Sequence, residues 1–119
     1  MNRLCFFEIP ADDLEALMKF YSDMFGWTFD AVPGKFRYYS ITQGNTSIKG
    51  GMTARQDPAH TPVNYVAVES VEAATEKAVG LGAKVVVSKD SVPGAGWYVV
   101  VLDPQGNRLG FWQDDPNAV

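Results

Sequence analysis

Polar and apolar residues alternate along most of the chain in short runs that are typical of β-strands, and two stretches instead follow the spacing of an amphipathic helix. Apolar residues recur three and four positions apart across residues 14–25 and, more thinly, across 71–81. This period predicts one helix in each stretch. The apolar stripes are Leu14, Leu17, Met18, Tyr21, Met24 and Phe25 in the first helix, and Val71, Ala74, Ala78 and Leu81 in the second.

Residues suited to helix ends flank both stretches. Asp12, followed three residues later by Glu15, fits a capping box, and Ser70 is a suitable N-cap for the second helix. Gly26 and Gly82 follow the last apolar positions, where a residue that tolerates a positive φ commonly ends a helix. Both helices are therefore predicted to be bounded by local sequence signals.

The chain consists of two related halves. ADDLEA (11–16) corresponds to VESVEA (68–73), and VPGKFRYYSITQGN (32–45) corresponds to VPGAGWYVVVLDPQGN (92–107). Each half has an extended run, a helix and three further strand-like runs, which predicts the order βαβββ twice. The strand-like runs cover residues 4–9, 27–32, 36–42 and 47–53 in the first half, and 63–68, 84–89, 97–103 and 108–113 in the second.

This order predicts an α+β fold made of duplicated βαβββ modules within a single domain, 1–119. Module one covers residues 1–53 and module two covers 63–119, joined by the polar, proline-containing linker 54–62. A Gln-Gly-Asn in each half is expected to form a tight hairpin turn.

Composition narrows the classes of function. With 119 residues, 46% hydrophobic and 20% charged, the chain fits a globular domain large enough to bury a core. Its apolar runs are far too short to span a membrane. A net charge of −4 without a cluster of Lys and Arg argues against nucleic acid as a partner. A single cysteine, Cys5, and no signal-like N-terminus favour a reducing, cytoplasmic location.

Two segments resemble a known family. FFEIPADDLEALMKFYSDMFGW (6–27) and LDPQGNRLGFW (102–112) are similar to the vicinal oxygen chelate superfamily, which includes glyoxalase I, bleomycin-resistance proteins and extradiol dioxygenases. The resemblance implies that the modules form an open, curled sheet around a cleft, with the helices on the outer faces. It also implies a homodimer.

The metal ligands of that family are missing here. The resemblance implies a His or Gln on the first strand of each half, at the positions of Phe6 and Val63, and a Glu three residues after Asn107, at Gly110. The corresponding place in the first half lies near residues 48–51. None of these side chains can bind a divalent ion, which needs three or four protein ligands. We therefore expect no metal and no cofactor, and the sequence disfavours a metal-dependent glyoxalase I or dioxygenase.

Alternation along the strands assigns side chains to the expected cleft. Phe6 and Glu8 should point into it from the first strand, while Phe7 and Ile9 pack under the helix. One of Tyr38 and Tyr39, which alternate, should also point inward, and Trp97 could add to the aromatic lining. The residues that we select as ligand-binding are Phe6, Tyr39, Tyr65, Arg108 and Trp112.

Glu8 is the candidate catalytic residue. A carboxylate in an apolar strand is costly unless it is paired, and its pKa could be raised to suit a general base. A structural role, with Glu8 hydrogen-bonded to a neighbouring strand or ion-paired with Arg108 or Arg37, fits the sequence slightly better, because structural ion pairs also perturb pKa values. The single histidine, His60, lies in the linker and is expected to be solvated, so a Ser/His/Asp triad is excluded.

Two functions remain open. One is a metal-independent, glyoxalase-like enzyme of the lyase or isomerase type, in which Glu8 moves a proton on a small carbonyl metabolite. Without a metal an enediolate loses its main electrophilic stabiliser, which disfavours glyoxalase chemistry itself. The other is a non-catalytic protein that sequesters an aromatic or cationic compound, as bleomycin-resistance proteins do.

Overall fold

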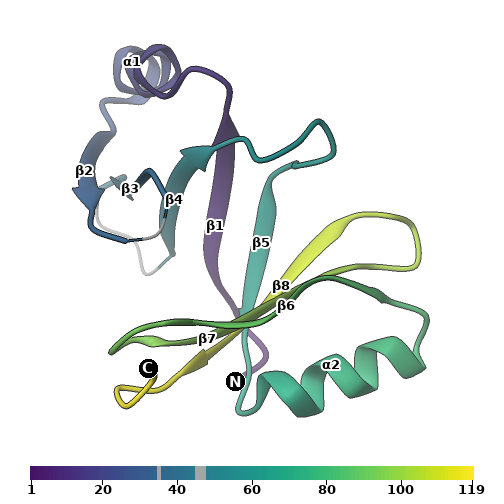
Figure 1. Ribbon diagram of the computed structural model, residues 1–119. Coiled ribbons are helices and arrows are strands. Elements are labelled where there is room, and N and C mark those ends of the chain that lie inside the picture. The colour runs from purple at the N-terminus through teal and green to yellow at the C-terminus, as the bar shows by residue number, and fades with distance from the viewer. Residues whose placement is uncertain (35, 45–47) are drawn as a thin grey trace. The chain divides into compact units, whose positions relative to one another are not determined.

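The computed structural model describes residues 1–34, 36–44 and 48–119, and its elements follow the βαβββ order twice (Figure 1). The α+β class with duplicated modules is therefore confirmed. Asn45 of the first Gln-Gly-Asn and Ser47 of the predicted strand 47–53 lie outside the described residues. The first repeat contains β1 (Leu4–Ala11), α1 (Leu14–Phe25), β2 (Thr28–Val32), β3 (Tyr38–Thr42) and β4 (Lys49–Ala54). The second contains β5 (Val63–Ala67), α2 (Val71–Gly80), β6 (Lys84–Val92), β7 (Gly96–Leu102) and β8 (Arg108–Asp114).

The chain divides into two compact units. One, the first-repeat unit, is Phe6–Pro62, and the other, the second-repeat unit, is Val63–Val119 together with Met1–Cys5. The strand order is β2-β3-β4-β1 in the first-repeat unit and β5-β8-β7-β6 in the second-repeat unit. In both, the first and last strands of the repeat pair in parallel and the remaining pairs are antiparallel. The sheet topology thus repeats along with the sequence.

In the first-repeat unit, α1 packs on one face of the strands. Its buried core consists of Ala11, Leu14, Ile41 and Met52, surrounded by half-buried side chains that include Phe7, Ile9, Leu17, Met18, Tyr21, Trp27 and Tyr39. Met24 and Phe25, predicted to extend the stripe, are 58% and 59% exposed. The apolar stripe of α1 therefore contributes its first two turns to the core.

The N-cap of α1 is Asp13 rather than Asp12. The Asp13 carboxylate accepts a hydrogen bond from the backbone N–H of Ala16 (3.0 Å), and Glu15 is ion-paired with Arg37. The predicted capping box of Asp12 and Glu15 is thus wrong, because Asp12 is ion-paired with Arg55, just after β4, and Glu15 with Arg37, just before β3. At the other end Gly26, with φ 71°, ends the helix as predicted.

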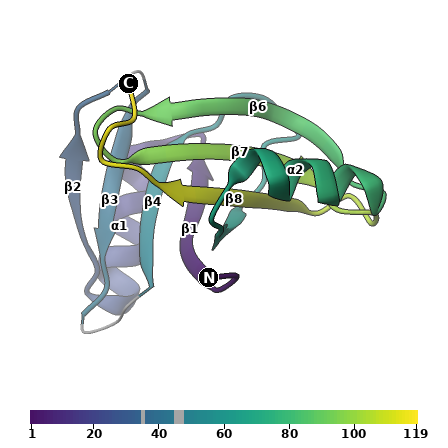
Figure 2. The same ribbon diagram turned by 90° about the horizontal axis from the view of Figure 1, so that it is seen from below.

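In the second-repeat unit, α2 lies along β6, β7 and β8 (Figure 2). The core between them is Val68, Val71, Val99, Val101 and Phe111. Ser70 caps α2 as predicted, and its hydroxyl accepts from the N–H of Ala73 (3.1 Å). Leu81 was predicted to belong to the apolar stripe but is 71% exposed, because the helix ends at Gly80.

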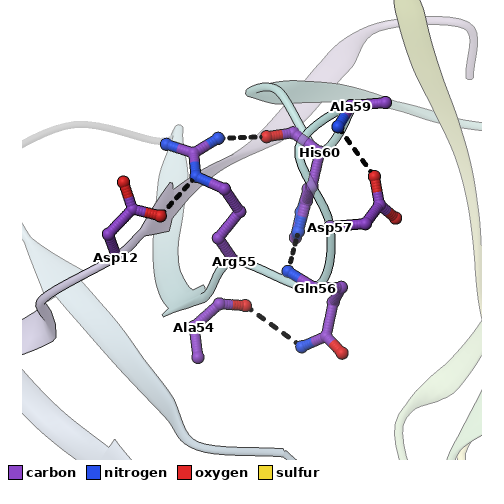
Figure 3. A network of polar contacts seen from close by, with 7 residues as sticks. All are labelled: Asp12, Ala54, Arg55, Gln56, Asp57, Ala59 and His60. Atoms are coloured by element: carbon purple, nitrogen blue, oxygen red, sulfur yellow. Dashed lines mark hydrogen bonds and ion pairs between the residues drawn. The ribbon is translucent and has the colours of Figure 1, made fainter.

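The segment after β4 is an ordered loop built around His60 (Figure 3). Nδ1 of His60 accepts the backbone N–H of Gln56 (3.0 Å), and Arg55 donates to the His60 carbonyl and, through Nε, to Asp12 (2.8 Å). The His60 residue is only 6% exposed. The expectation of a solvated histidine is therefore wrong: the imidazole is buried and accepts a hydrogen bond from the loop backbone. None of the helices in the described ranges is long and apolar enough to cross a membrane.

Candidate functional site

Each unit has one sheet face without a helix, and the alternation of side chains decides what lies on it. On β1, Phe7 and Ile9 pack in the α1 core, which places Phe6 and Glu8 on the opposite, helix-free face. On β8, Leu109 and Phe111 pack toward α2. Arg108, Gly110 and Trp112 therefore occupy the helix-free face of the second-repeat unit, as predicted from the sequence.

Glu8 forms a pair with Tyr38 on the helix-free face of the first-repeat unit. The Tyr38 hydroxyl donates to Oε2 of Glu8 at 2.9 Å, and both side chains are half-buried. In the parallel β1–β4 register, Glu8 is opposite Gly51. A Cβ atom at Gly51 would lie 1.9 Å from the Tyr38 hydroxyl oxygen, so the phenol reaches Glu8 by passing over a bare backbone.

A second tyrosine covers a second glycine in the second-repeat unit. Tyr65 is opposite Gly110 in the parallel β5–β8 register, and a Cβ atom at Gly110 would lie 2.2 Å from Cδ1 of the ring. Tyr65 is 7% exposed, so the ring is buried. This contact explains the glycine between Arg108 and Trp112: only a residue without a side chain admits the ring.

The registers of the two parallel strand pairs also identify which residue of the first half, within 48–51, corresponds to Gly110. Tyr65 is the repeat partner of Glu8, 57 residues further along the sequence. Their partners across the parallel pair, Gly110 and Gly51, are therefore equivalent as well. Gly51 is thus the residue within 48–51 that corresponds to Gly110.

The residues of this chain do not fit the divalent metal site that the family resemblance implies. Its four ligand positions correspond to Phe6, Gly51, Val63 and Gly110, none of which has a donor side chain. At the two glycines even a methyl group would collide with a tyrosine. Within residues 1–34, 36–44 and 48–119, no three His, Cys, Asp or Glu side chains are grouped so as to hold a metal.

Tyr39, selected from the sequence as the ligand-binding tyrosine, packs on the helix side of the sheet. Its ring lies against the core that contains Met52, and its hydroxyl is 3.3 Å from Nη2 of Arg37. The hydrogen bond to Tyr39 and the ion pair with Glu15 raise the pKa of Arg37. Strand alternation therefore gives Tyr38, not Tyr39, to the face of Glu8, and Arg37 is engaged by Glu15.

Trp112 lies beside a tyrosine that was not selected from the sequence. Trp112 is directly opposite Tyr98 in the β7–β8 register, and its ring covers Gly96, where a Cβ would lie 2.6 Å from Cζ2. The indole N–H donates to Asp114 (2.7 Å), and the Tyr98 hydroxyl to Asp90 (3.3 Å). The two aromatic side chains, which face each other across neighbouring strands, are thus each hydrogen-bonded to a carboxylate.

The remaining selected residues are half-buried strand residues. Phe6 on β1 is opposite Lys49, and Arg108 on β8 is opposite Leu102. Trp97, by contrast, packs on the α2 side and donates its indole N–H to Asp115 (2.9 Å).

The site residues that were not selected from the sequence are Tyr38, the alternative to Tyr39, and Tyr98. They are repeat partners in the two related segments that begin with Val-Pro-Gly, at positions 32 and 92. Both donate a phenol hydrogen bond to a carboxylate of the same unit. The sequence signal that could have identified them is a tyrosine at the same position in both halves of the repeat.

Two shallow hollows lie beside the loop that follows β4. One, of about 480 Å³, is lined by Asp12, Arg55, Gln56, Asp57 and Pro58. The other, of about 360 Å³, shares Asp12 and Arg55 and extends toward Phe20 of α1. Arg55 is held by Asp12 and by the His60 carbonyl, and neither hollow includes Glu8 or Tyr38.

Comparison with known proteins gives relatives in bacteria. The chain is 30% identical over 113 residues to "Putative glyoxylase CFP32" of Mycobacterium tuberculosis, and 25% identical over 124 residues to the anthracycline biosynthesis protein DnrV of Streptomyces peucetius. These matches cover 89% and 90% of this chain but only 43% and 45% of the relatives. The chain therefore spans less than half the length of the curated relatives that it matches.

Solved structures share the fold at low sequence identity. Methylmalonyl-CoA epimerase from Mycobacterium tuberculosis superposes with a TM-score of 0.71 at 14% identity, covering 95% of this chain and 88% of that one. A glyoxalase/bleomycin resistance protein/dioxygenase superfamily member from Vibrio splendidus superposes with a TM-score of 0.65 at 15% identity, covering 97% of this chain and all of that one.

The family model that matches covers nearly the whole chain, residues 3–111. Together with the duplicated βαβββ topology and the shared fold, this match makes the assignment: the chain belongs to the Glyoxalase/Bleomycin resistance protein/Dioxygenase superfamily.

Proposed function

We propose that this protein is a metal-independent, glyoxalase-like enzyme of the lyase or isomerase type, in which Glu8 transfers a proton at a carbon next to a carbonyl group. The observation that carries the proposal is the Glu8 carboxylate, held by the Tyr38 phenol on a helix-free sheet face. A half-buried carboxylate in a fixed orientation is suited to general-base work.

The absence of donors at the family's ligand positions supports the metal-independent part of the proposal. Gly51 and Gly110 lie under tyrosine side chains, so a ligating Glu would not fit at either place. Proton abstraction by a carboxylate does not itself require a metal, provided that other groups stabilise the enolate. Elemental analysis of chelator-treated, refolded protein should find no stoichiometric divalent metal, and one equivalent would overturn this part.

The enzyme proposal is tested by exchange of the acidic proton in D₂O, followed by ¹H NMR. The probes are methylmalonyl-CoA, chosen from the fold neighbours, and the hemithioacetal of methylglyoxal and glutathione, chosen from the glyoxylase-named relatives. Exchange of either probe by chelator-treated protein, lost in Glu8→Gln and retained in Glu76→Gln, would support the proposal. Glu76 is a matched control because it is exposed on α2. Exchange that survives Glu8→Gln unaltered would refute the role of Glu8.

A non-catalytic binder is the second candidate, favoured by the pair of Tyr98 and Trp112. The two neighbouring aromatic rings could stack on a planar compound, and the carboxylates of Asp90 and Asp114, hydrogen-bonded to them, would attract a cationic one. Quenching of tryptophan fluorescence by ethidium, a planar cation, tests this idea. Saturable quenching that is weakened in Trp112→Leu, with no exchange of the two carbonyl probes, would favour the binder.

A homodimer and a cytoplasmic location complete the proposal. The curated relatives are more than twice as long as the part that matches, which leaves room in them for a second copy of this fold. Light scattering coupled to size-exclusion chromatography should give twice the 13.0 kDa of one chain, and a mass of 13.0 kDa would contradict the dimer.

A further inference from the structure

The hydrogen bond between Tyr38 and Glu8 depends on three strands of the first-repeat unit. β1 carries Glu8, β3 carries Tyr38, and β4 lies between them with Gly51 at the crossing point. A side chain at position 51 would occupy the space of the phenol oxygen, since its Cβ would be 1.9 Å away. The contact therefore exists only because β4 has a glycine at this position.

The start of β3 is itself fixed by β4. Tyr38 is opposite Thr53 in the antiparallel register, and the Thr53 hydroxyl donates to the carbonyl of Arg37 at 2.9 Å. Thr53 is 5% exposed, so the donor side chain is buried. The backbone that carries Tyr38 is thus held in place immediately before the phenol crosses Gly51.

We propose that Tyr38 is a positioning residue that holds the Glu8 carboxylate ionised and in one orientation, and that residue 51 is a glycine so that the phenol can reach it. This inference rests on the proposed function, in which Glu8 transfers the proton. The phenol donates one hydrogen bond to Oε2, and a hydrogen bond to the charged form of a carboxylate favours that form.

The second-repeat unit uses the equivalent positions differently, which makes the pair specific to one half. There the position equivalent to Glu8 is Tyr65, whose ring covers Gly110. The position equivalent to Tyr38 is Tyr98, whose hydroxyl donates to Asp90 on β6. In the first-repeat unit the Tyr38 phenol thus reaches a carboxylate across a glycine, whereas the Tyr98 phenol bonds to a carboxylate on the neighbouring strand. The carboxylate and its phenol therefore form one polar centre rather than a repeated structural motif.

The inference is tested by titrating Glu8 directly, with no substrate present. Protein labelled with ¹³C at the glutamate carboxyl carbon is followed by NMR as the pH is lowered, and the signal missing in Glu8→Gln identifies Glu8. In Tyr38→Phe the titration midpoint of Glu8 should rise by about one pH unit, because a hydrogen bond to a charged group has been lost. Gly51→Ala should raise it in the same direction by displacing the phenol.

Tyr39→Phe is the matched control. It removes a phenol from the adjacent residue, whose hydroxyl contacts Arg37 on the other face of the sheet, and should leave the Glu8 midpoint unchanged. An unchanged midpoint in Tyr38→Phe would overturn the inference. Because Tyr38→Phe removes only one oxygen atom, it tests the inference even if Gly51→Ala does not fold.

The titration separates this inference from the proposed enzyme. A shifted midpoint in a protein that exchanges neither carbonyl probe would support the role of Tyr38 and refute the proposed chemistry for those probes. Where a probe is exchanged, Tyr38→Phe should also move the acid limb of its pH–rate profile to higher pH, an effect that a loss of stability alone does not produce. An acid limb at its original pH would count against Tyr38 even if Glu8 were essential.

Discussion

Gly110→Ala is the most direct test of how the tyrosines occupy the family's metal-ligand positions. The new Cβ would lie 2.2 Å from Cδ1 and 2.4 Å from Cε1 of Tyr65, whereas carbon atoms in ordinary contact are about 3.5–4.0 Å apart. The ring would therefore have to move by more than about 1 Å. Since Tyr65 is 7% exposed, it can move only by displacing its neighbours.

The expected cost follows from this forced rearrangement. Overpacking of a well-packed site by a methyl group destabilises a fold by about 1–3 kcal/mol. For a chain of 119 residues, about 1 kcal/mol corresponds to roughly 4 °C in melting temperature. The melting temperature of Gly110→Ala should accordingly fall by about 4–12 °C.

Circular dichroism during heating measures this change, with Gly80→Ala as the matched control. A Cβ at Gly80, in α2, would meet no atom within 4 Å, so this variant should gain up to about 1 kcal/mol from helix propensity. In a Tyr65→Ala background the cost of Gly110→Ala should disappear, because the colliding ring is gone. The reasoning is refuted if Gly110→Ala is as stable as Gly80→Ala, or if its cost persists without the Tyr65 ring.

Two further predictions concern stability away from the site. His60→Ala should lower the free energy of unfolding by about 1–3 kcal/mol in urea denaturation, because a buried side chain and its hydrogen bond with the N–H of Gln56 are both lost. A change below about 0.5 kcal/mol, typical of surface substitutions, would contradict the role of the imidazole. Hydrogen bonds from the backbone N–H of Asn107 to Asp103, and from the indole of Trp97 to Asp115, lower the pKa of each carboxyl group. A carboxylate whose pKa is lowered by folding adds stability above its unfolded-state pKa and loses it as the pH falls through the folded-state pKa. Thermal stability should therefore decline below about pH 4, and less steeply in Trp97→Phe; equal slopes in both proteins would contradict the contribution of Asp115.

The sequence alone determined the architecture and the family, because both depend on local patterns. The period of apolar residues, the caps at Ser70 and Gly26, and the related segments of the two halves gave the βαβββ order twice. Strand alternation also placed Phe6 and Glu8, and Arg108 with Trp112, on the helix-free faces. The periods, caps and alternation are encoded within a few residues of one another, and the repeat is found by comparing the two halves of the sequence. All of them can therefore be predicted without knowing how the strands pair.

Only the tertiary structure decided which side chains meet. Strand register placed Gly51 opposite Glu8 and Gly110 opposite Tyr65, and thereby brought Tyr38, rather than Tyr39, to the carboxylate. Asp12 bonds to Arg55, 43 residues away, instead of capping the helix. His60 is buried and hydrogen-bonded within its loop, although a loop histidine was expected to be solvated. Contacts between residues far apart in the chain depend on register and side-chain packing, which the local pattern of polar and apolar residues does not specify.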